Sequence, residues 1–406
     1  MAYIDELGTN AKSAEQSFRT VLSADKDKIL AAIADAFRDE NNINSVISAN
    51  SEDLKNAVAN GIPTVMHDRL MLDKNRILKI ADSVNELIAL PDPIGEVLGG
   101  FVRPNGLRVS KVRVPLGVIG IIFESRPNVT VDAAVLCLKS GNVCILRGGK
   151  EAINSNIAIM DIMQTAIENL GFDKNIVQLV KDTSRETSSE MMKANKYIDV
   201  LIPRGGAGLI QNVVQNSTVP VIETGAGNCQ AYVDEFADID MAVNIIDNAK
   251  TQRPSVCNAI ETLLVHKNIA DKFLPAISEK WNGKVEMRGF NSDVTEDDFY
   301  KEFNDYIIAV KIVQSVDEAI SHINKYGTKH SECIVTNSYQ NAKKFEQGVD
   351  AAAVYVNAST RFTDGGEFGF GAEIGISTQK LHARGPMGLT ELTTVKYIIN
   401  GNGQIR

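Results

Sequence analysis

The run Val114-Pro115-Leu116-Gly117-Val118-Ile119-Gly120-Ile121-Ile122-Phe123 is the longest apolar, uncharged segment of the chain. It opens a region in which apolar runs alternate with amphipathic segments of helical length, most clearly residues 152–170. Short apolar runs separated by helices are typical of a parallel sheet covered by helices. The region therefore predicts an α/β domain. Its strands are expected at Gly117–Phe123, Val143–Leu146, Ile176–Val180 and Ile198–Ile202.

Two more regions have a clear pattern. Residues from about 10 to 90 predict helices, since Ile29, Ile33 and Phe37 recur at helical spacing and Asp73 stands where it would cap a later helix. From Ile260 onward the strand and helix alternation returns and predicts a second α/β domain. Its strands are expected at Leu263–Val265, Ile307–Val313, Cys333–Val335 and Ala352–Val356.

The segment Phe101-Val102-Arg103-Pro104-Asn105-Gly106-Leu107-Arg108-Val109 predicts a β-hairpin. Asn-Gly between two β-prone arms is the strongest short-range signal for such a turn. Residues 393–399 predict a late strand that would join this hairpin. A hairpin so rich in Arg and Lys is either simply solvated or paired with another subunit.

Length and composition limit the function. The 406 residues allow two or three domains, and 42 Lys and Arg against 51 Asp and Glu give a net charge of −9. This charge repels nucleic acid and anionic lipid, so an anionic substrate needs a local basic pocket. The five cysteines form no CxxC pair, no secretory signal precedes the chain's helices, and no apolar run approaches the roughly 20 residues that span a bilayer. We expect a soluble, cytoplasmic protein that binds neither nucleic acid nor membrane.

Two glycine pairs follow predicted strands, in Leu146-Arg147-Gly148-Gly149-Lys150 and in Ile202-Pro203-Arg204-Gly205-Gly206. Neither belongs to a GxGxxG or GxxxxGK[ST] fingerprint. Glycine at the carboxyl end of a strand lets a phosphate approach the backbone, and a following helix supplies N–H donors. Each pair is therefore either a plain tight turn or an anion site.

Cys257 is the cysteine that stands in a polar, Pro-bearing loop, Thr251-Gln252-Arg253-Pro254-Ser255-Val256-Cys257-Asn258. It is either structural or a nucleophile, and Arg253 would favour its thiolate form. Cys137 and Cys144 lie in apolar runs and are expected to fill cores.

The histidines give no metal signal. His322, His330 and Cys333 have no recognised ligand spacing and are interpreted as loop residues, so no metal is expected. His382 belongs to the basic cluster Lys380-Leu381-His382-Ala383-Arg384 and is either solvated or in contact with an anion.

Several motifs resemble known enzymes. Glu223-Thr224-Gly225-Ala226-Gly227, with Cys257 34 residues after Glu223, resembles the aldehyde dehydrogenase superfamily. The resemblance is closer to its gamma-glutamyl phosphate reductases, and it extends from the N-terminal helices to the C-terminal strand. The segments that carry it are Phe123–Thr130, Pro203–Gly206, Arg253–Asn258 and Phe368–Gly375.

The resemblance implies an aldehyde dehydrogenase-like α/β fold in three parts. A Rossmann-like cofactor domain would comprise residues 1–97 and 113–226. A catalytic α/β domain would comprise residues 227–386. Residues 98–112 and 387–406 would form a small β element for homo-oligomerisation.

The resemblance also implies a reaction, the NADPH-dependent reduction of L-glutamyl 5-phosphate to L-glutamate 5-semialdehyde and phosphate in proline biosynthesis. Cys257 would form a thioester, and Glu223 either helps to deprotonate Cys257 or is structural. The Asn of ordinary aldehyde dehydrogenases that holds the oxyanion has no clear counterpart, so Asn128 or Ser125, with the Cys257 N–H, are the candidates.

For the cofactor, the resemblance places Arg147 and Lys150 near the adenosine ribose, where cations attract a 2′-phosphate, and hence favours NADPH over NADH. Gly205 and Gly206 would lie beside the pyrophosphate. Glu302 resembles the family's glutamate at the nicotinamide ribose.

For the substrate, Arg126 is the candidate for the acyl phosphate and Arg361 for the α-carboxylate, although each could instead form a structural ion pair on a loop. A glutamate 5-kinase is a candidate partner. The alternatives are another aldehyde dehydrogenase relative that oxidises a semialdehyde or reduces an acyl-CoA, and a silent scaffold on the same fold. The presence of Cys257 and Glu223 argues against the scaffold.

Overall fold

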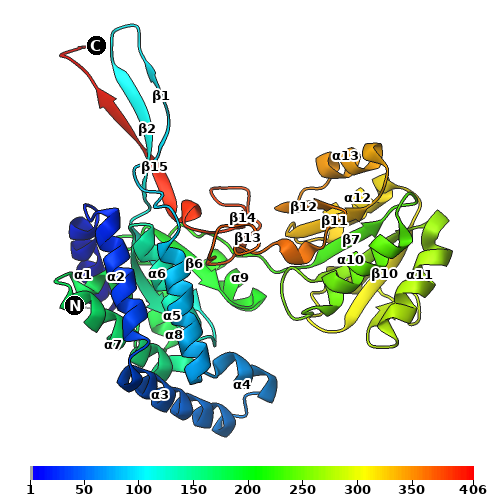
Figure 1. Cartoon of the computed structure of the whole chain (residues 1–406), viewed down its shortest axis with the longest axis horizontal. Helices are drawn as coiled ribbons and strands as arrows, with labels where there is room; N and C mark the ends of the chain where they lie inside the picture. Colours follow the sequence, from blue (N-terminus) through cyan, green and yellow to red (C-terminus); the bar gives the residue numbers. More distant parts are fainter. Residues whose placement is uncertain (1–2) are drawn as a thin grey trace. The chain divides into compact units, whose positions relative to one another are not determined.

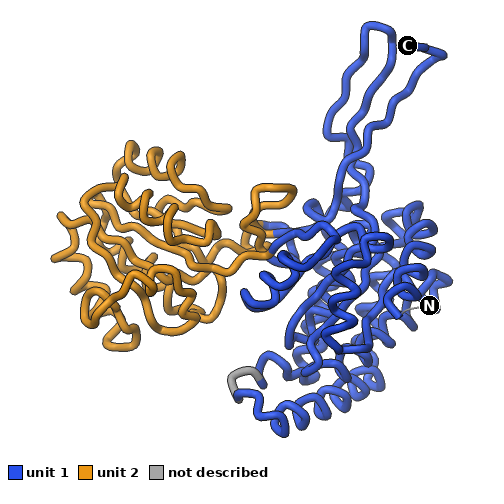
Figure 2. Tube along the Cα trace, turned by 180° about the vertical axis from the view of Figure 1, so that it is seen from behind, with its two compact units in different colours: residues 1–223, 369–375, 387–406 blue, residues 224–368, 376–386 orange. Residues whose placement is uncertain are grey.

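The computed structural model describes residues 3–406, and for residues 64–66 it describes the backbone alone. The described chain forms two compact units (Figure 2). Unit 1 extends to Glu223 and also holds residues 369–375 and 387–406. Unit 2 holds residues 224–368 and 376–386, so the chain passes between the units four times.

The N-terminal part of unit 1 is helical, which confirms the expectation for residues 10–90. Ile29 and Ile33 are fully buried, and Phe37 is buried where its helix ends. The Asp73 carboxylate accepts a hydrogen bond from the Arg76 N–H at 2.8 Å and so caps the last of these helices. The helices are α1 (Tyr3–Phe18), α2 (Ser23–Ala36), α3 (Glu40–Ala59), α4 (Thr64–Leu70) and α5 (Lys74–Ile88).

Unit 1 contains a parallel sheet in the order β5-β4-β3-β6, with helices packed around it (Figure 1). All six residues of β3 are buried, as a central strand covered by helices requires. The four strands match the four predicted apolar runs. They are β3 (Val118–Phe123), β4 (Val143–Arg147), β5 (Val177–Leu179) and β6 (Val200–Arg204), and the helices between and after them are α6 (Asn128–Lys139), η1 (Lys150–Ala152), α7 (Ile153–Asn169), η2 (Lys174–Ile176), α8 (Arg185–Met192) and α9 (Ala207–Asn216).

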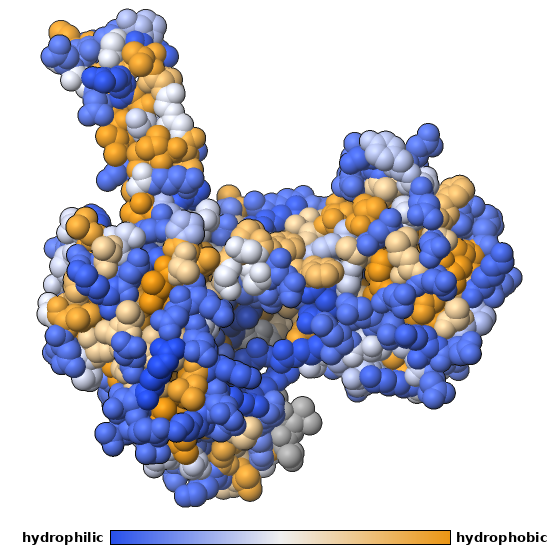
Figure 3. All heavy atoms as spheres, viewed as in Figure 1, coloured by the Kyte–Doolittle hydropathy of each residue, from blue (hydrophilic) through white to orange (hydrophobic). Residues whose placement is uncertain are grey.

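A three-stranded antiparallel sheet projects from unit 1 (Figure 1). Gly106 has a φ of 87° in the turn, a conformation that favours glycine. Both the hairpin and the joining of the C-terminal strand are confirmed, because the strand order is β1-β2-β15. Apolar side chains such as Phe101, Val102 and Ile399 are exposed on it, and Figure 3 shows apolar residues along its length. The strands are β1 (Val97–Val102), β2 (Arg108–Pro115) and β15 (Thr393–Asn400).

Unit 2 is built on a six-stranded parallel sheet in the order β12-β11-β7-β8-β10-β9. Its helices pack their apolar faces against both faces of the sheet. The buried residues form two core clusters, one around Phe273 and one around Phe345. The strands are β7 (Cys229–Val233), β8 (Ile260–His266), β9 (Glu286–Arg288), β10 (Ile307–Val313), β11 (Ser331–Val335) and β12 (Ala353–Val356). The helices are α10 (Ile239–Thr251), α11 (Lys267–Trp281), η3 (Glu296–Tyr300), α12 (Val316–Tyr326), α13 (Tyr339–Gly348) and η4 (Thr360–Phe362). The short strands β13 (Ile376–Ser377) and β14 (Gly385–Pro386) pair with each other, and η5 (Thr390–Leu392) belongs to unit 1.

The structure corrects three expectations for unit 2. The sheet has two strands that were not expected, β7 and β9. His322 and Cys333 are not loop residues, since His322 is buried on α12 and Cys333 is buried on β11. His330 does lie in the connection between α12 and β11, and it is fully buried there. Burial lowers the pKa of His330 to about 4, so its imidazole is neutral at pH 7. Among the described residues no group of three or more His, Cys, Asp or Glu could hold a metal ion.

The unit boundaries differ from the expected domain boundaries. Unit 2 begins at Thr224 rather than at residue 227, and residues 369–375, which were expected in the catalytic domain, pack with unit 1. The β1-β2-β15 sheet, expected as a separate element, also belongs to unit 1. No helix within residues 3–406 combines the length and apolarity needed to cross a membrane.

A buried ion pair ties the end of α10 to the start of β8. Lys250 Nζ lies 2.6 Å from Glu261 Oε2, and both side chains are inaccessible to solvent. Burial raises the pKa of Glu261 to about 7, an effect that the Lys250 ammonium opposes, and burial lowers the pKa of Lys250. The second oxygen, Oε1, accepts a hydrogen bond from the Asn304 N–H. The pair closes the ends of the loop of residues 252–259, which carries Cys257.

This ion pair predicts a pH-dependent stability. In Lys250→Met the carboxyl of Glu261 loses its cation, so we expect its pKa to rise further. We also expect the free energy of unfolding of unit 2 to fall by about 3 kcal/mol. A folded pKa above the unfolded one gives stability that is complete below the unfolded pKa and is lost as the pH rises through the folded pKa. Relative to wild type, the free energy of unfolding should therefore fall by about 1.4 kcal/mol per pH unit from pH 7 up to the raised folded pKa of Glu261 in the variant, and should level off above it.

The measurement is urea unfolding followed by the fluorescence of Trp281, the single tryptophan, which is buried in unit 2. The double variant Lys250→Met/Glu261→Gln is the control, because it has no charge to bury and should lose this pH dependence. Parallel pH profiles for Lys250→Met and wild type would contradict the interpretation.

Candidate active site

Cys257 lies in the loop of residues 252–259 in unit 2. A tight turn shapes the loop, with the Ala259 N–H donating to the Val256 carbonyl at 3.0 Å. Cys257 is partly exposed, whereas Cys137, Cys144, Cys229 and Cys333 are buried. Burial raises the pKa of the Cys229 thiol well above its usual range. Among the cysteines, Cys257 is thus the one with access to a ligand.

The backbone of Cys257 is seated against the start of β7. A Cβ at Gly227 would lie 1.6 Å from the Cys257 carbonyl oxygen, so this position requires glycine. The Cys229 thiol donates to the same carbonyl at 3.0 Å. Gly227 is held in turn by Glu302, whose Oε1 accepts from the Gly227 N–H at 3.0 Å. These contacts hold the loop at Cys257 itself, in addition to the ion pair that joins its ends.

A second loop of unit 2 is bonded to the Cys257 loop. Asn258 Nδ2 donates to the carbonyls of Arg361 and Thr363 at 3.3 and 2.9 Å, and Thr360 Oγ1 donates to the Asn258 carbonyl at 2.7 Å. The side chain of Asn258, next to the thiol, therefore positions the segment that carries Arg361.

Two arginines act on one another near the thiol. Arg361 Nε donates to Gln252 Oε1 at 2.9 Å. Burial lowers the pKa of Arg361, the positive charge of Arg253 lowers it further, and the Cys257 thiol opposes these effects. Unit 2 thus brings together Cys257, Arg253 and Arg361. Sequence reasoning did not include Arg253 among the site residues, although its place in the Cys257 motif was a signal.

The sheet of unit 1 has a topological switch point at the carboxyl ends of its strands. The chain leaves β3 toward β4 on one side, and β6 lies on the other side, which makes a topological switch point between β3 and β6. Ligands of open α/β sheets bind at such points. Residues 124–127 follow β3, and Gly205-Gly206 follow β6 and lead into α9.

A carboxylate lies at the N-terminus of α9. Glu124 Oε2 accepts from the Gly206 N–H at 2.8 Å, and a Cβ at Gly205 would lie 2.6 Å from the same oxygen. An N–H at a helix N-terminus is a favourable donor to an anion, and here the anion belongs to the chain itself. Sequence reasoning missed Glu124, although it lies within a segment quoted for the resemblance.

The other predicted residues of this segment lie close to it in the chain. Ser125 is partly buried and Arg126 is exposed, both in the loop between β3 and α6. Asn128 begins α6 and donates from Nδ2 to Asp132 Oδ2 at 2.9 Å. Burial raises the pKa of Asp132 to about 6, and this hydrogen bond opposes the effect. Because an amide carries two N–H donors, Asn128 can still donate to a ligand.

Arg147 and Lys150 follow β4. Arg147 Nη2 donates to the Thr183 carbonyl at 2.7 Å, and its Nε is buried with no hydrogen-bond partner among the described residues. Burial lowers the pKa of Arg147, and the carboxylates of Glu151 and Asp182 oppose this. Lys150 is exposed at the start of η1.

The remaining predicted site residues are Glu223 in unit 1 and His382 in unit 2. Glu223 is partly buried and is the last residue of unit 1 before the chain enters unit 2 at Thr224. His382 is exposed with a φ of 67° between β13 and β14, in unit 2.

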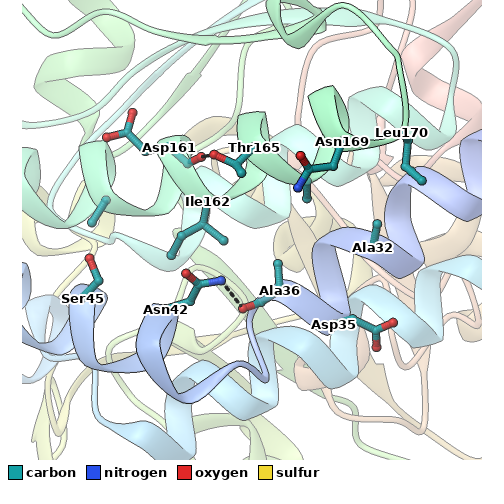
Figure 4. Close-up of a pocket in the computed structure, with 12 residues that line it drawn as sticks. Ala32, Asp35, Ala36, Asn42, Ser45, Asp161, Ile162, Thr165, Asn169 and Leu170 are labelled. Carbon is teal, nitrogen blue, oxygen red and sulfur yellow. Dashed lines mark hydrogen bonds between the residues drawn. The ribbon is translucent and has the colours of Figure 1, made fainter.

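A groove of about 600 Å³ in unit 1 contains none of the predicted site residues (Figure 4). It lies between α2, α3 and α7, where alanines such as Ala32 and Ala158 leave space. Asn42 Nδ2 donates to the Ala36 carbonyl at 2.9 Å at its wall. The groove follows from small side chains at helix contacts and is not a candidate for the chemistry.

Comparison with known proteins defines the class of enzyme. The aldehyde dehydrogenase family model matches residues 2–295. The crystal structure of an acetylating aldehyde dehydrogenase from Geobacillus thermoglucosidasius has the same fold, with a TM-score of 0.71 at 20% identity over 99% of this chain and 97% of the other. The class is an oxidoreductase of the aldehyde dehydrogenase type, which implies a nicotinamide cofactor.

Closer relatives are more specific. The chain is 56% identical to the gamma-glutamyl phosphate reductase of Caldicellulosiruptor bescii over 99% of both chains, and 58% identical to that of Clostridium perfringens over 98% of both. The crystal structure of gamma-glutamyl phosphate reductase from Thermotoga maritima has a TM-score of 0.96 at 47% identity, covering 99% of both chains. The chain belongs to the gamma-glutamyl phosphate reductases of the aldehyde dehydrogenase family. The expected family, fold class and enzyme class are confirmed.

The exposure of the cysteines predicts a selective reaction. Native protein treated with iodoacetamide should take up one carbamidomethyl group, on the peptide that contains Cys257, because the other four thiols are buried. Cys257→Ser should take up none until it is denatured. Peptide mass spectrometry measures this, and rapid labelling of Cys229 in the native protein would contradict the description of the site.

Proposed function

We propose that this enzyme reduces L-glutamyl 5-phosphate with NADPH to L-glutamate 5-semialdehyde and phosphate, a step of proline biosynthesis, through a thioester on Cys257. The observation that supports this most is the partly exposed Cys257, fixed by Gly227 and Cys229 and accompanied by Arg253 and Arg361. The printed names of the near full-length relatives supply the substrate class.

Cys257 performs the covalent step. Its thiolate forms a bond to the acyl carbon while the bond from that carbon to the phosphate oxygen breaks, and phosphate leaves with the electron pair. When bound, a nicotinamide cofactor would supply the hydride needed to reduce the carbon of the Cys257 thioester. As the resulting thiohemiacetal collapses, the carbon–sulfur bond breaks, the aldehyde leaves and the Cys257 thiolate returns.

Three further groups assist at the acyl carbon. The oxyanion that forms there accepts hydrogen bonds from the Cys257 N–H and from Asn128 or Ser125. The proposal needs no attack by water, so Glu223 serves either to take the Cys257 proton or to hold the chain where it enters unit 2.

The residues of unit 1 fit a dinucleotide. The buried Nε of Arg147 lacks a partner among the described residues and can donate to an anion, and exposed Lys150 adds a second cation. Both favour the 2′-phosphate of NADPH. Gly205 and Gly206 border the pyrophosphate at the switch point, where Glu124 must give up the Gly206 N–H to a phosphate oxygen.

Glu302 fits a ribose hydroxyl with the oxygen that does not bond to Gly227, since a carboxylate accepts several hydrogen bonds. The same residue would then join the cofactor to the Gly227 backbone, against which Cys257 is seated.

The substrate needs cations for its phosphoryl and carboxylate groups, and Arg126, Arg361 and His382 remain the proposed contacts from the sequence. The β1-β2-β15 sheet is proposed to bridge copies of the chain, because its exposed apolar residues would be buried by a partner. We also propose that the enzyme is cytoplasmic and that it receives the labile acyl phosphate from a glutamate 5-kinase.

The reverse reaction tests the function. Glutamate semialdehyde, NADP and phosphate should yield NADPH with wild type, and Cys257→Ala should lower the rate by about 10⁴-fold or more, since no thioester can form. The Trp281 fluorescence controls for folding. Turnover without phosphate would instead indicate a semialdehyde oxidase, turnover that needs coenzyme A an acyl-CoA reductase, and no turnover a scaffold.

Charge reversal tests the choice of cofactor. Lys150→Glu should lower the ratio of kcat/KM for NADPH to that for NADH by about 10- to 100-fold, because a carboxylate repels the 2′-phosphate. Lys193→Glu, also exposed but at the far end of α8, is the matched control. An unchanged ratio in Lys150→Glu would show that Lys150 does not contact the 2′-phosphate.

A further inference from the structure

Arg253 belongs to the Cys257 loop, and Arg361, in η4 after β12, is hydrogen-bonded to that loop. Arg253 precedes Cys257 in residues 252–259. Arg361 is fixed at both its ends: its Nε donates to Gln252 Oε1 at 2.9 Å, and its carbonyl accepts from Asn258 Nδ2. Gln252 and Asn258 flank Arg253 and Cys257 in the chain, so one loop positions both the thiol and the guanidinium of Arg361.

Gln252, whose side chain binds Arg361, precedes Arg253 in the chain, and the positive charge of Arg253 lowers the pKa of Arg361. Neither guanidinium group forms an ion pair with a carboxylate within residues 3–406, although Asp364 acts on Arg361 from a greater distance. By contrast, Arg288 on β9 pairs with both Glu286 and Asp298. Two adjacent cations without a paired carboxylate, beside a nucleophile, are complementary to a dianion.

The chemistry of the substrate class distinguishes its two anionic groups. In an acyl phosphate the phosphorus is two bonds from the carbon that the thiolate attacks, whereas the α-carboxylate carbon of a 5-glutamyl group is four bonds away. The phosphoryl group also carries up to two negative charges, while the carboxylate carries one. The anion that must lie closest to Cys257 is therefore the one whose charge matches the arginine pair.

We propose that Arg253 and Arg361 together bind the phosphoryl group of the acyl phosphate, and inorganic phosphate in the reverse direction. This assignment rests on the proposed function. It gives Arg361 a different anion from the α-carboxylate expected from the sequence, and it adds Arg253 to the residues that touch substrate. As phosphate leaves, the pair stabilises the charge that develops on the departing oxygen.

The reverse reaction separates the two anions, because phosphate and semialdehyde are then different substrates with separate KM values. Arg253→Gln and Arg361→Gln should each raise the KM for phosphate by about 10-fold or more and leave the KM for the semialdehyde within about twofold. Lys272→Gln, which removes an exposed charge on α11, is the matched control. A rise confined to the KM for the semialdehyde, or no change in either, would overturn the assignment.

Binding can also be tested without turnover. Inorganic phosphate should slow the alkylation of Cys257 by iodoacetamide in wild type, at an ionic strength held constant with KCl, and should fail to do so in Arg253→Gln and Arg361→Gln. Equal protection in wild type and variants would overturn the assignment. If wild type shows no phosphate-dependent turnover at all, the proposed function fails, and the protection experiment still decides whether the arginine pair binds phosphate.

Folding is controlled by the Trp281 fluorescence. Where a Gln variant loses the native emission, Arg253→Lys and Arg361→Lys take its place, since Lys keeps the charge but lacks the two-pronged donor geometry. We then expect a rise of about three- to tenfold in the KM for phosphate. An unchanged KM in both Lys variants would overturn the assignment.

Discussion

The buried ion pair between Lys250 and Glu261 is the constraint on which the reactive loop depends. A loop on the surface would ordinarily be mobile, and a nucleophile held within a few tenths of an ångström needs support from rigid elements. Here the last turn of α10 and the first residues of β8 are joined in the core by charges inaccessible to solvent. Gly227 and Cys229 hold the same loop from β7. Cys257 therefore owes its position to the core of unit 2 rather than to contacts at the surface.

The same loop resolves an apparent conflict in the electrostatics. A chain with a net charge of −9 repels anions at long range, yet its proposed substrate and cofactor both carry phosphate. Because salt screens exposed charges over about 8–10 Å, an anion near the site responds mainly to the charges closest to it. Arg253 and Arg361 near the thiol, and Arg147 and Lys150 after β4, are such local cations. The net negative charge thus disfavours nonspecific binding of anionic partners, while the local cations still attract the phosphate groups of substrate and cofactor.

The sequence predicted those parts of the fold that local pattern determines. The four strands of unit 1 were predicted correctly because each is a continuous apolar run. The hairpin was predicted correctly because its turn is an Asn-Gly dipeptide, whose glycine adopts the left-handed conformation. β7 was missed because Gln230 and Tyr232 interrupt its apolar character, and β9 because it has three residues. His330 does lie in the connection before β11, but its burial was not foreseen because it depends on segments distant in the chain. The assignment of residues 369–375 to unit 1 is likewise a result of long-range packing.

The candidate site likewise has residues that local sequence identifies and residues that only long-range packing places. A motif identifies Cys257 because the nucleophile and the residues around it are contiguous in sequence, and strand ends identify the glycine pairs for the same reason. The sequence around Cys257 does not reveal that Arg361 accompanies the thiol. Arg361 reaches the loop only through hydrogen bonds to Gln252 and from Asn258, residues about a hundred positions earlier that have no sequence signal of their own. Because these two polar side chains flank Arg253 and Cys257, replacement of one loop residue can alter both the nucleophile and the charge beside it. The Cys257 loop is thus better understood as one unit, in which Gln252 and Asn258 hold Arg361 near Arg253 and Cys257, than as a cysteine with an incidental arginine.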